Sequence, residues 1–109
     1  MIYEVEVSEQ ADRDLREFFE YIAFELQSPE NAIGQLNRLE EQILSLDAMP
    51  KRYRKYEKEP WKSRELHILP VDNYVILYIP NSDKKVVTIL RVMYAGRDID
   101  NQLNFHTKQ

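Results

Sequence analysis

The sequence predicts an α+β fold in which a helical hairpin covers one face of a small antiparallel sheet. An alternating strand pattern opens the chain, two amphipathic stretches follow, and three segments rich in β-branched and aromatic residues come after a basic loop. The 109 residues are enough for one core, so we expect a single domain spanning residues 1–109. The expected elements are an N-terminal strand, an antiparallel helical hairpin, a three-strand antiparallel meander and a short C-terminal helix.

Residues 2–7 form the first expected element. Tyr3, Val5 and Val7 alternate with Glu4 and Glu6, which is the period of a half-buried strand. A lone strand has no backbone partners, so we expect it to pair with a later strand across the hairpin.

Two helices are expected between Ser8 and Pro50. Ser8 can cap the first, and Ser28 followed by Pro29 restarts the helical pattern. Apolar residues recur every three to four positions along both helices, and the predicted core-facing residues are Ala11, Leu15, Phe18, Ile22, Leu26, Ala32, Leu36, Leu39, Ile43 and Leu46. Because about one residue separates the helices, they should fold back as an antiparallel hairpin.

The second half of the chain predicts the meander. Its strands are expected at Arg64–Leu69, Tyr74–Ile79 and Val86–Tyr94, with turns at 70–73 and 81–85. Asp98 can cap a last helical turn that reaches Leu103, and residues 104–109 are expected to fray. With one hairpin on the sheet, the opposite sheet face should remain open.

Composition excludes several classes of protein. With 43% apolar and 31% charged residues, the chain reads as an ordinary globular domain, neither disordered nor membrane-spanning. It has no cysteine, and His67 and His106 are its only histidines, which disfavours disulfides, thiolate chemistry, zinc sites and serine triads. The absence of nucleotide, metal and flavin motifs predicts no cofactor. The first residues lack a signal-peptide pattern, so we expect a cytoplasmic protein.

Charge divides the chain into an acidic and a basic half. Residues 1–50 carry 3 basic and 12 acidic side chains, whereas residues 51–109 carry 12 basic and 7 acidic ones. The basic excess is densest at residues 51–64, where Tyr53, Tyr56 and Trp61 lie between the cations. The candidate nucleic-acid-binding residues are Lys51, Arg52, Arg54, Lys55 and Lys62. The alternative is a solvated loop whose aromatic side chains pack back on the core.

Several short segments, in this order and spacing, resemble the RelE/ParE superfamily of toxins from bacterial type II toxin-antitoxin systems. They are Tyr3-Glu4-Val5 with Ser8, Ala11, Asp14 and Leu15; Tyr21-Ile22; Pro29 with Ala32; Leu46 before Pro50; Arg64-Glu65-Leu66; residues 73–78; and residues 87–94 running into Arg97-Asp98. The resemblance covers nearly the whole chain. It implies a small growth inhibitor, associated with functions such as plasmid stabilization, that a cognate antitoxin neutralises.

The resemblance implies two possible mechanisms, because fold alone does not fix function. RelE-like members cut mRNA in the ribosome without a metal, and ParE-like members trap DNA gyrase on cleaved DNA. In the RelE-like nucleases an arginine directly follows the aromatic residue of the third strand, where this chain has Val75. Two further lysines of those enzymes correspond to Leu66 and Ile68, and aliphatic side chains cannot bind phosphate.

The candidate catalytic residues, should the protein be a nuclease, are Arg64, Arg91, Arg97, His67 and Tyr94. Only Arg97 lies in register with another family arginine. Each also has a structural interpretation: His67 as a plain strand residue, Tyr94 as a packing residue, and Arg97 with Asp98 as a loop ion pair and cap. Arg91 lies in an apolar strand, so either an internal carboxylate or an external phosphate must meet it.

Three functional hypotheses remain. The toxin poisons DNA gyrase, or it is a ribosome-dependent mRNA endoribonuclease, or it is a non-toxic binding partner or operon co-repressor. The apolar residues at Val75, Leu66 and Ile68 favour the gyrase hypothesis over the nuclease. The expected partners are thus the antitoxin and either gyrase or the ribosome with mRNA, with no membrane and no small-molecule cofactor.

Overall fold

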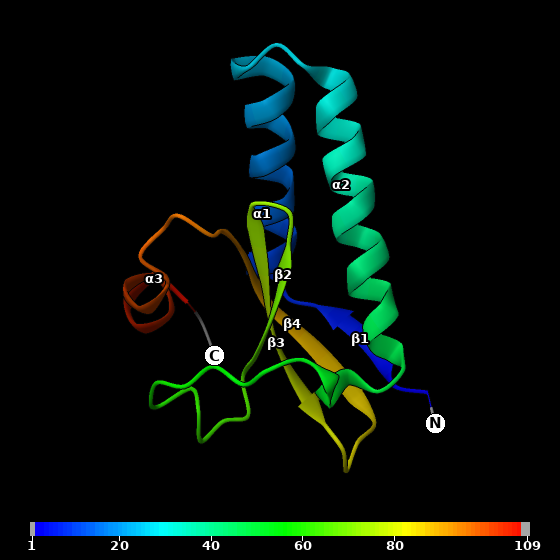
Figure 1. Cartoon of the computed structure of the whole chain (residues 1–109), viewed down its shortest axis with the longest axis vertical. Coiled ribbons are helices and arrows are strands. Elements are labelled where there is room, and N and C mark those ends of the chain that lie inside the picture. Colours follow the sequence, from blue (N-terminus) through cyan, green and yellow to red (C-terminus); the bar gives the residue numbers. More distant parts are fainter. Residues whose placement is uncertain (1, 108–109) are drawn as a thin grey trace.

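The computed structural model describes residues 2–107 and has the expected α+β architecture (Figure 1). Its elements are β1 (Glu4–Val7), α1 (Glu9–Glu20), α2 (Pro29–Leu44), β2 (His67–Val71), β3 (Tyr74–Asn81), β4 (Val86–Tyr94) and α3 (Ile99–His106). The four strands form one sheet in the order β1-β4-β3-β2. β2, β3 and β4 pair antiparallel, and β1 pairs parallel with β4, with Val5 opposite Val87. The predicted meander and the predicted pairing of the first strand are confirmed.

The helical hairpin begins as predicted. The Ser8 side chain accepts a hydrogen bond of 3.0 Å from the Ala11 amide and so caps α1. The predicted core stripe on this helix is wrong in its last turn, where Leu26 is exposed and Ala23 is buried instead. At this point the regular helical spacing is interrupted by a π-helical turn at Tyr21–Glu25, and the hairpin has passed the last residues that join the first core, Phe18 and Leu36.

The first core lies between the hairpin and the sheet. From the helices it takes Ala11, Leu15, Leu39, Ile43 and Leu46, and from the strands Leu69, Val71, Tyr74, Ile76, Tyr78, Val87, Ile89 and Val92. Arg38 of α2 and Asp72 of the β2–β3 turn form an ion pair of 2.7 Å that ties the hairpin to the sheet.

The opposite sheet face is not open, and this expectation was wrong. Residues 56–66 and α3 cover it and form a second core with the strands, whose buried members are Trp61, Leu66, Ile68, Val75, Leu77, Leu90, Met93 and Leu103. The strands carry apolar residues on both faces, so both faces need cover. α3 therefore continues to His106, beyond the predicted end at Leu103, and residues 108 and 109 of the predicted frayed segment lie outside the described residues.

The strand predicted at Arg64–Leu69 is shifted to His67–Val71. Glu65 has a left-handed φ of 64° and belongs to the turn before the strand. Pro70 stays within β2 because β2 is the last strand of the sheet, where a missing N–H on the outer side is tolerated.

The basic segment extends the sheet beyond β2. The Ile68 amide donates to the Arg54 carbonyl at 3.0 Å, and the Tyr56 amide donates to the Leu66 carbonyl at 2.8 Å. These bonds occupy backbone groups on the outer edge of β2, which would otherwise be free to pair with another chain. None of the helices formed by residues 2–107 is long and apolar enough to cross a membrane.

Candidate functional site

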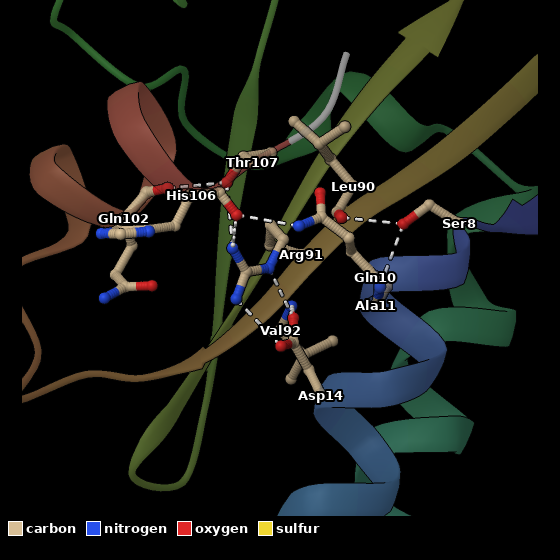
Figure 2. Close-up of polar contacts among 10 residues, drawn as sticks. All are labelled: Ser8, Gln10, Ala11, Asp14, Leu90, Arg91, Val92, Gln102, His106 and Thr107. Atoms are coloured by element: carbon tan, nitrogen blue, oxygen red, sulfur yellow. Dashed lines mark hydrogen bonds and ion pairs between the residues drawn. The ribbon is translucent and has the colours of Figure 1, made fainter.

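Arg91 lies in a buried polar network where α1, β4 and the end of α3 meet (Figure 2). Its guanidinium makes two bonds to the Asp14 carboxylate, from Nε at 2.7 Å and from Nη2 at 2.9 Å. Nη1 donates to the His106 carbonyl and to the Thr107 hydroxyl, both at 3.0 Å. An internal carboxylate therefore meets Arg91, which is one of the two alternatives that its apolar strand required.

The same helix completes the edge of β4. β1 ends at Val7, so on the side that faces β1 the strand β4 has no strand neighbour beyond Ile89. There the Ser8 hydroxyl donates to the Leu90 carbonyl at 2.8 Å, and the Val92 amide donates to the Asp14 carboxylate at 3.0 Å. α1 thus supplies side-chain partners to backbone groups that a longer first strand would have paired.

The histidine and tyrosine candidates lie in aromatic contacts. His67 is buried, with Nδ1 2.8 Å from the Glu65 carbonyl oxygen and its ring 5.4 Å from that of Tyr78. Tyr94 ends β4 half exposed, and its ring meets the Tyr74 ring edge-on at 5.9 Å.

The two remaining arginine candidates are exposed. Arg64 lies over the Trp61 ring, 5.0 Å from its centre, on the face of the sheet that the second core occupies. Arg97 follows β4, and its amide donates to the Tyr94 carbonyl at 3.1 Å. The structure thus brings Arg97 next to Tyr94. His67 contacts Tyr78 of the first core, so it lies on the opposite face of the sheet from Arg64.

The three positions where the resemblance implies cations are part of the second core. Leu66, Ile68 and Val75 are all at most 5% exposed. They share this core with Trp61 from the basic segment and Leu103 from α3. No phosphate can approach these positions while the two covering segments are in place.

The basic segment, residues 51–64, exposes its cations to solvent and packs its aromatic side chains against the protein. Lys51, Arg52, Arg54, Lys55 and Lys62 are all exposed. Two of them already have protein partners. Lys55 pairs with Glu65 at 2.6 Å, and Arg52 donates to the backbone carbonyls of the segment that follows α2, at residues 45–49.

The aromatic residues of this segment pack inward. The Trp61 indole is buried and donates to the Asn104 side chain at 2.9 Å. The Tyr56 hydroxyl and the Lys58 ammonium both bond the Asp100 carboxylate, which joins the segment to α3. The hydrogen bond from Lys58, followed by that from Tyr56, holds the pKa of Asp100 below its ordinary value. Burial, with the neighbouring Asp100 carboxylate, raises the pKa of Tyr56.

A groove of about 450 Å³ runs along the helical hairpin. Its apolar lining comes from Val7, Leu15, Phe19, Leu36, Ile43 and Leu44. The sequence did not reveal it, because several of these residues belong to the stripes that were assigned to the core. The apolar pattern of a helix shows how wide its apolar stripe is. It does not show whether the whole stripe is buried in the core or whether part of it lines an open groove. Among residues 2–107 there is no cluster of carboxylates and histidines that could hold a metal ion.

The fold resembles those of known toxins. A chain of a chromosomal ParDE system from P. aeruginosa matches with a TM-score of 0.71 and 17% identity over 85% of this chain and 96% of that one. A chain of the RelBE2 toxin-antitoxin complex from Mycobacterium tuberculosis matches with a TM-score of 0.64 and 22% identity over 86% and 99%. A mutant of the E. coli toxin RelE in the free state gives a TM-score of 0.60 and 17% identity over 91% and 90%.

A comparison with curated proteins found no match. The family model described as the ParE toxin of the type II toxin-antitoxin system parDE matches residues 5–99, from the first strand to the start of α3. This match includes the hairpin and all four strands. The chain therefore belongs to the ParE toxin family of type II toxin-antitoxin systems, within the RelE/ParE superfamily.

Proposed function

We propose that this toxin arrests growth by poisoning DNA gyrase, and that it does not cut mRNA. The burial of Leu66, Ile68 and Val75 carries the proposal. Cleaving RNA without a metal needs a base for the ribose hydroxyl and several cations around the developing phosphate charge. Here the corresponding positions hold apolar side chains beneath Trp61 and α3.

The environment of Arg91 supports the same conclusion. Its Nε and both terminal nitrogens already donate to protein oxygens, and Asp14 balances its charge. Freeing the guanidinium for phosphate would leave a carboxylate buried without its counter-ion, which is strongly unfavourable. Arg64 and Arg97 are the exposed arginine candidates, and of these two Arg97 has another candidate, Tyr94, beside it.

The deciding experiment follows DNA and mRNA after brief induction in a host without the antitoxin. We expect double-strand DNA breaks and an SOS response while mRNA stays intact. Primer extension checks the mRNA, and Arg97→Ala should leave toxicity unchanged. Cuts at codon positions that disappear with Arg97→Ala would show a RelE-like nuclease instead. Normal growth with soluble toxin present would favour a non-toxic binding partner.

We further propose that a cognate antitoxin occupies the groove on the hairpin. The second core covers the far face of the sheet, whereas this groove is an apolar surface that stays open to a partner. The solved ParDE and RelBE2 structures are described as toxin-antitoxin assemblies, which supports a protein partner of this kind. A gene for the antitoxin is expected beside that of the toxin, and its product should reverse the growth arrest.

A further inference from the structure

The end of the helical hairpin exposes a concentrated group of apolar side chains. We call residues 20–33 the hairpin tip. Tyr21, Phe24, Leu26 and Ile33 are 55%, 70%, 56% and 51% exposed, and they are four of the ten large apolar side chains that the described residues expose. The tip stands beyond the end of the sheet, at the top of Figure 1.

These side chains do not stabilise the fold. On the hairpin, the first core ends at Phe18 of α1 and Leu36 of α2. Beyond that point the small residues Ala23 and Ala32 are buried, while the large ones face solvent. Removing a large apolar side chain from water is favourable, and this tip leaves four of them mostly exposed. An exposed group of this size is typical of a binding surface.

The backbone of the tip is also irregular. The Leu26 amide bonds the Tyr21 carbonyl at 3.0 Å, five residues back, and Gln27 then turns with a left-handed φ of 51°. π-helical turns are rare and occur frequently at functional sites. Leu26, which follows this turn, is exposed although the helical stripe in the sequence predicts that it is buried.

The charge of the tip is of one sign. Residues 20–33 contain no lysine or arginine, and their three acidic residues, Glu20, Glu25 and Glu30, are all exposed. The tip therefore presents apolar side chains within a negative field. A complementary partner has an apolar pocket surrounded by lysine and arginine side chains.

We propose that the hairpin tip is the surface by which the toxin docks on a basic region of its target protein. This inference rests on the proposed function, under which that target is DNA gyrase. The antitoxin occupies a different surface, because the groove runs along the hairpin between α1 and α2, and none of the four exposed apolar residues of the tip lines it. The toxin would then meet its two partners with two parts of one hairpin.

The test uses purified toxin, gyrase and plasmid DNA. Phe24→Ala with Leu26→Ala removes apolar contact from exposed positions, so it should lower gyrase affinity about tenfold or more without changing thermal unfolding. Phe105→Ala is the matched control, because Phe105 is 76% exposed on α3, away from the tip. Glu25→Lys, at an exposed tip residue that does not line the groove, should also weaken gyrase binding, and added salt should weaken the binding of the wild type.

Each result is decisive. Loss of gyrase binding and of growth arrest, with antitoxin capture and unfolding unchanged, supports the proposal. The proposal is overturned if the double variant Phe24→Ala with Leu26→Ala binds gyrase as strongly as Phe105→Ala does. It is also overturned if the double variant no longer captures the antitoxin, because the tip would then be an antitoxin site. If the wild type is a dimer and the double variant is a monomer, the tip binds a second copy of the toxin instead, and the proposal is overturned.

The proposed function can fail separately. In that case the wild type arrests growth but leaves no cleaved DNA with gyrase. Growth arrest by the double variant then becomes the test of docking through the tip. Arrest that disappears with Phe24→Ala and Leu26→Ala supports docking on another target, and arrest that persists overturns the inference.

Discussion

Asp14 and Arg91 form a bidentate ion pair although 77 positions separate them in the sequence. The pair joins α1 to β4, and Arg91 also holds the end of α3 by donating to the His106 carbonyl. The Asp14 carboxylate has a second task, because it accepts from the Val92 amide at the unpaired edge of β4. The buried ion pair therefore holds helix, strand and C-terminal segment together, with Asp14 bonding β4 and Arg91 bonding the end of α3.

Asp14→Ala should destabilise the protein by about 3–5 kcal/mol, because it leaves Arg91 charged and buried and also removes the acceptor of the Val92 amide. Urea unfolding measures the change. The control is Asp12→Ala, which breaks the exposed pair with Arg16 and should change stability by less than about 1 kcal/mol. Equal effects of the two substitutions would contradict a structural role for Asp14.

Replacing both partners should be better tolerated than replacing one. Asp14→Leu together with Arg91→Met removes the ion pair without leaving a lone buried charge. We expect the double variant to be more stable than Asp14→Ala in the same urea titration. A double variant that is less stable than the single one would show that the hydrogen bonds to Val92, His106 and Thr107 outweigh the charge.

Asp100→Asn should lower stability at neutral pH and have little effect in acid. The pKa of Asp100 is lowered in the folded protein, chiefly by the hydrogen bond from Lys58, so its contribution is present above the ordinary value of 3.8. It is lost as the pH falls through the lower folded value. Denaturant titrations at neutral pH and at successively lower pH values below 3.8 should show the difference between variant and wild type shrinking toward zero. A difference that persists in acid would contradict this assignment.

Trp61→Ala should destabilise the protein by about 3–5 kcal/mol, because it removes a large buried side chain from the second core. Trp61 is the only tryptophan, so its fluorescence reports this core directly. The native emission should be that of a buried indole and should shift to longer wavelength when the core opens. Phe105→Ala, at an exposed site on α3, should leave both stability and emission unchanged.

Antitoxin binding should depend on apolar contact more than on charge. Leu44 is exposed and lines the hairpin groove, so Leu44→Glu should weaken antitoxin capture about tenfold or more. The complex of the wild-type toxin should persist in half-molar salt, because screening affects exposed charges and not buried apolar area. Dissociation between low and half-molar salt would instead assign the affinity to the basic segment.

The amino-acid sequence by itself determined the elements and the family. Period-two alternation places β1, apolar stripes with Ser8 and Pro29 place the helices, and turn residues separate the strands, all of which are local signals. The order of short segments was enough to recognise the superfamily, and the family model confirms it. The substitutions at Leu66, Ile68 and Val75 were equally visible in the sequence.

Only the tertiary structure decided what meets across the sheet. Asp14 as the partner of Arg91, the cover over the second face and the division of the helical stripes between core and groove all depend on residues far apart in the sequence. A periodic pattern records that a side chain is apolar, but not which surface covers it. The exposure of Leu26 was hidden for a related reason, because the apolar stripe continues in the sequence beyond Phe18, where the first core ends in the structure.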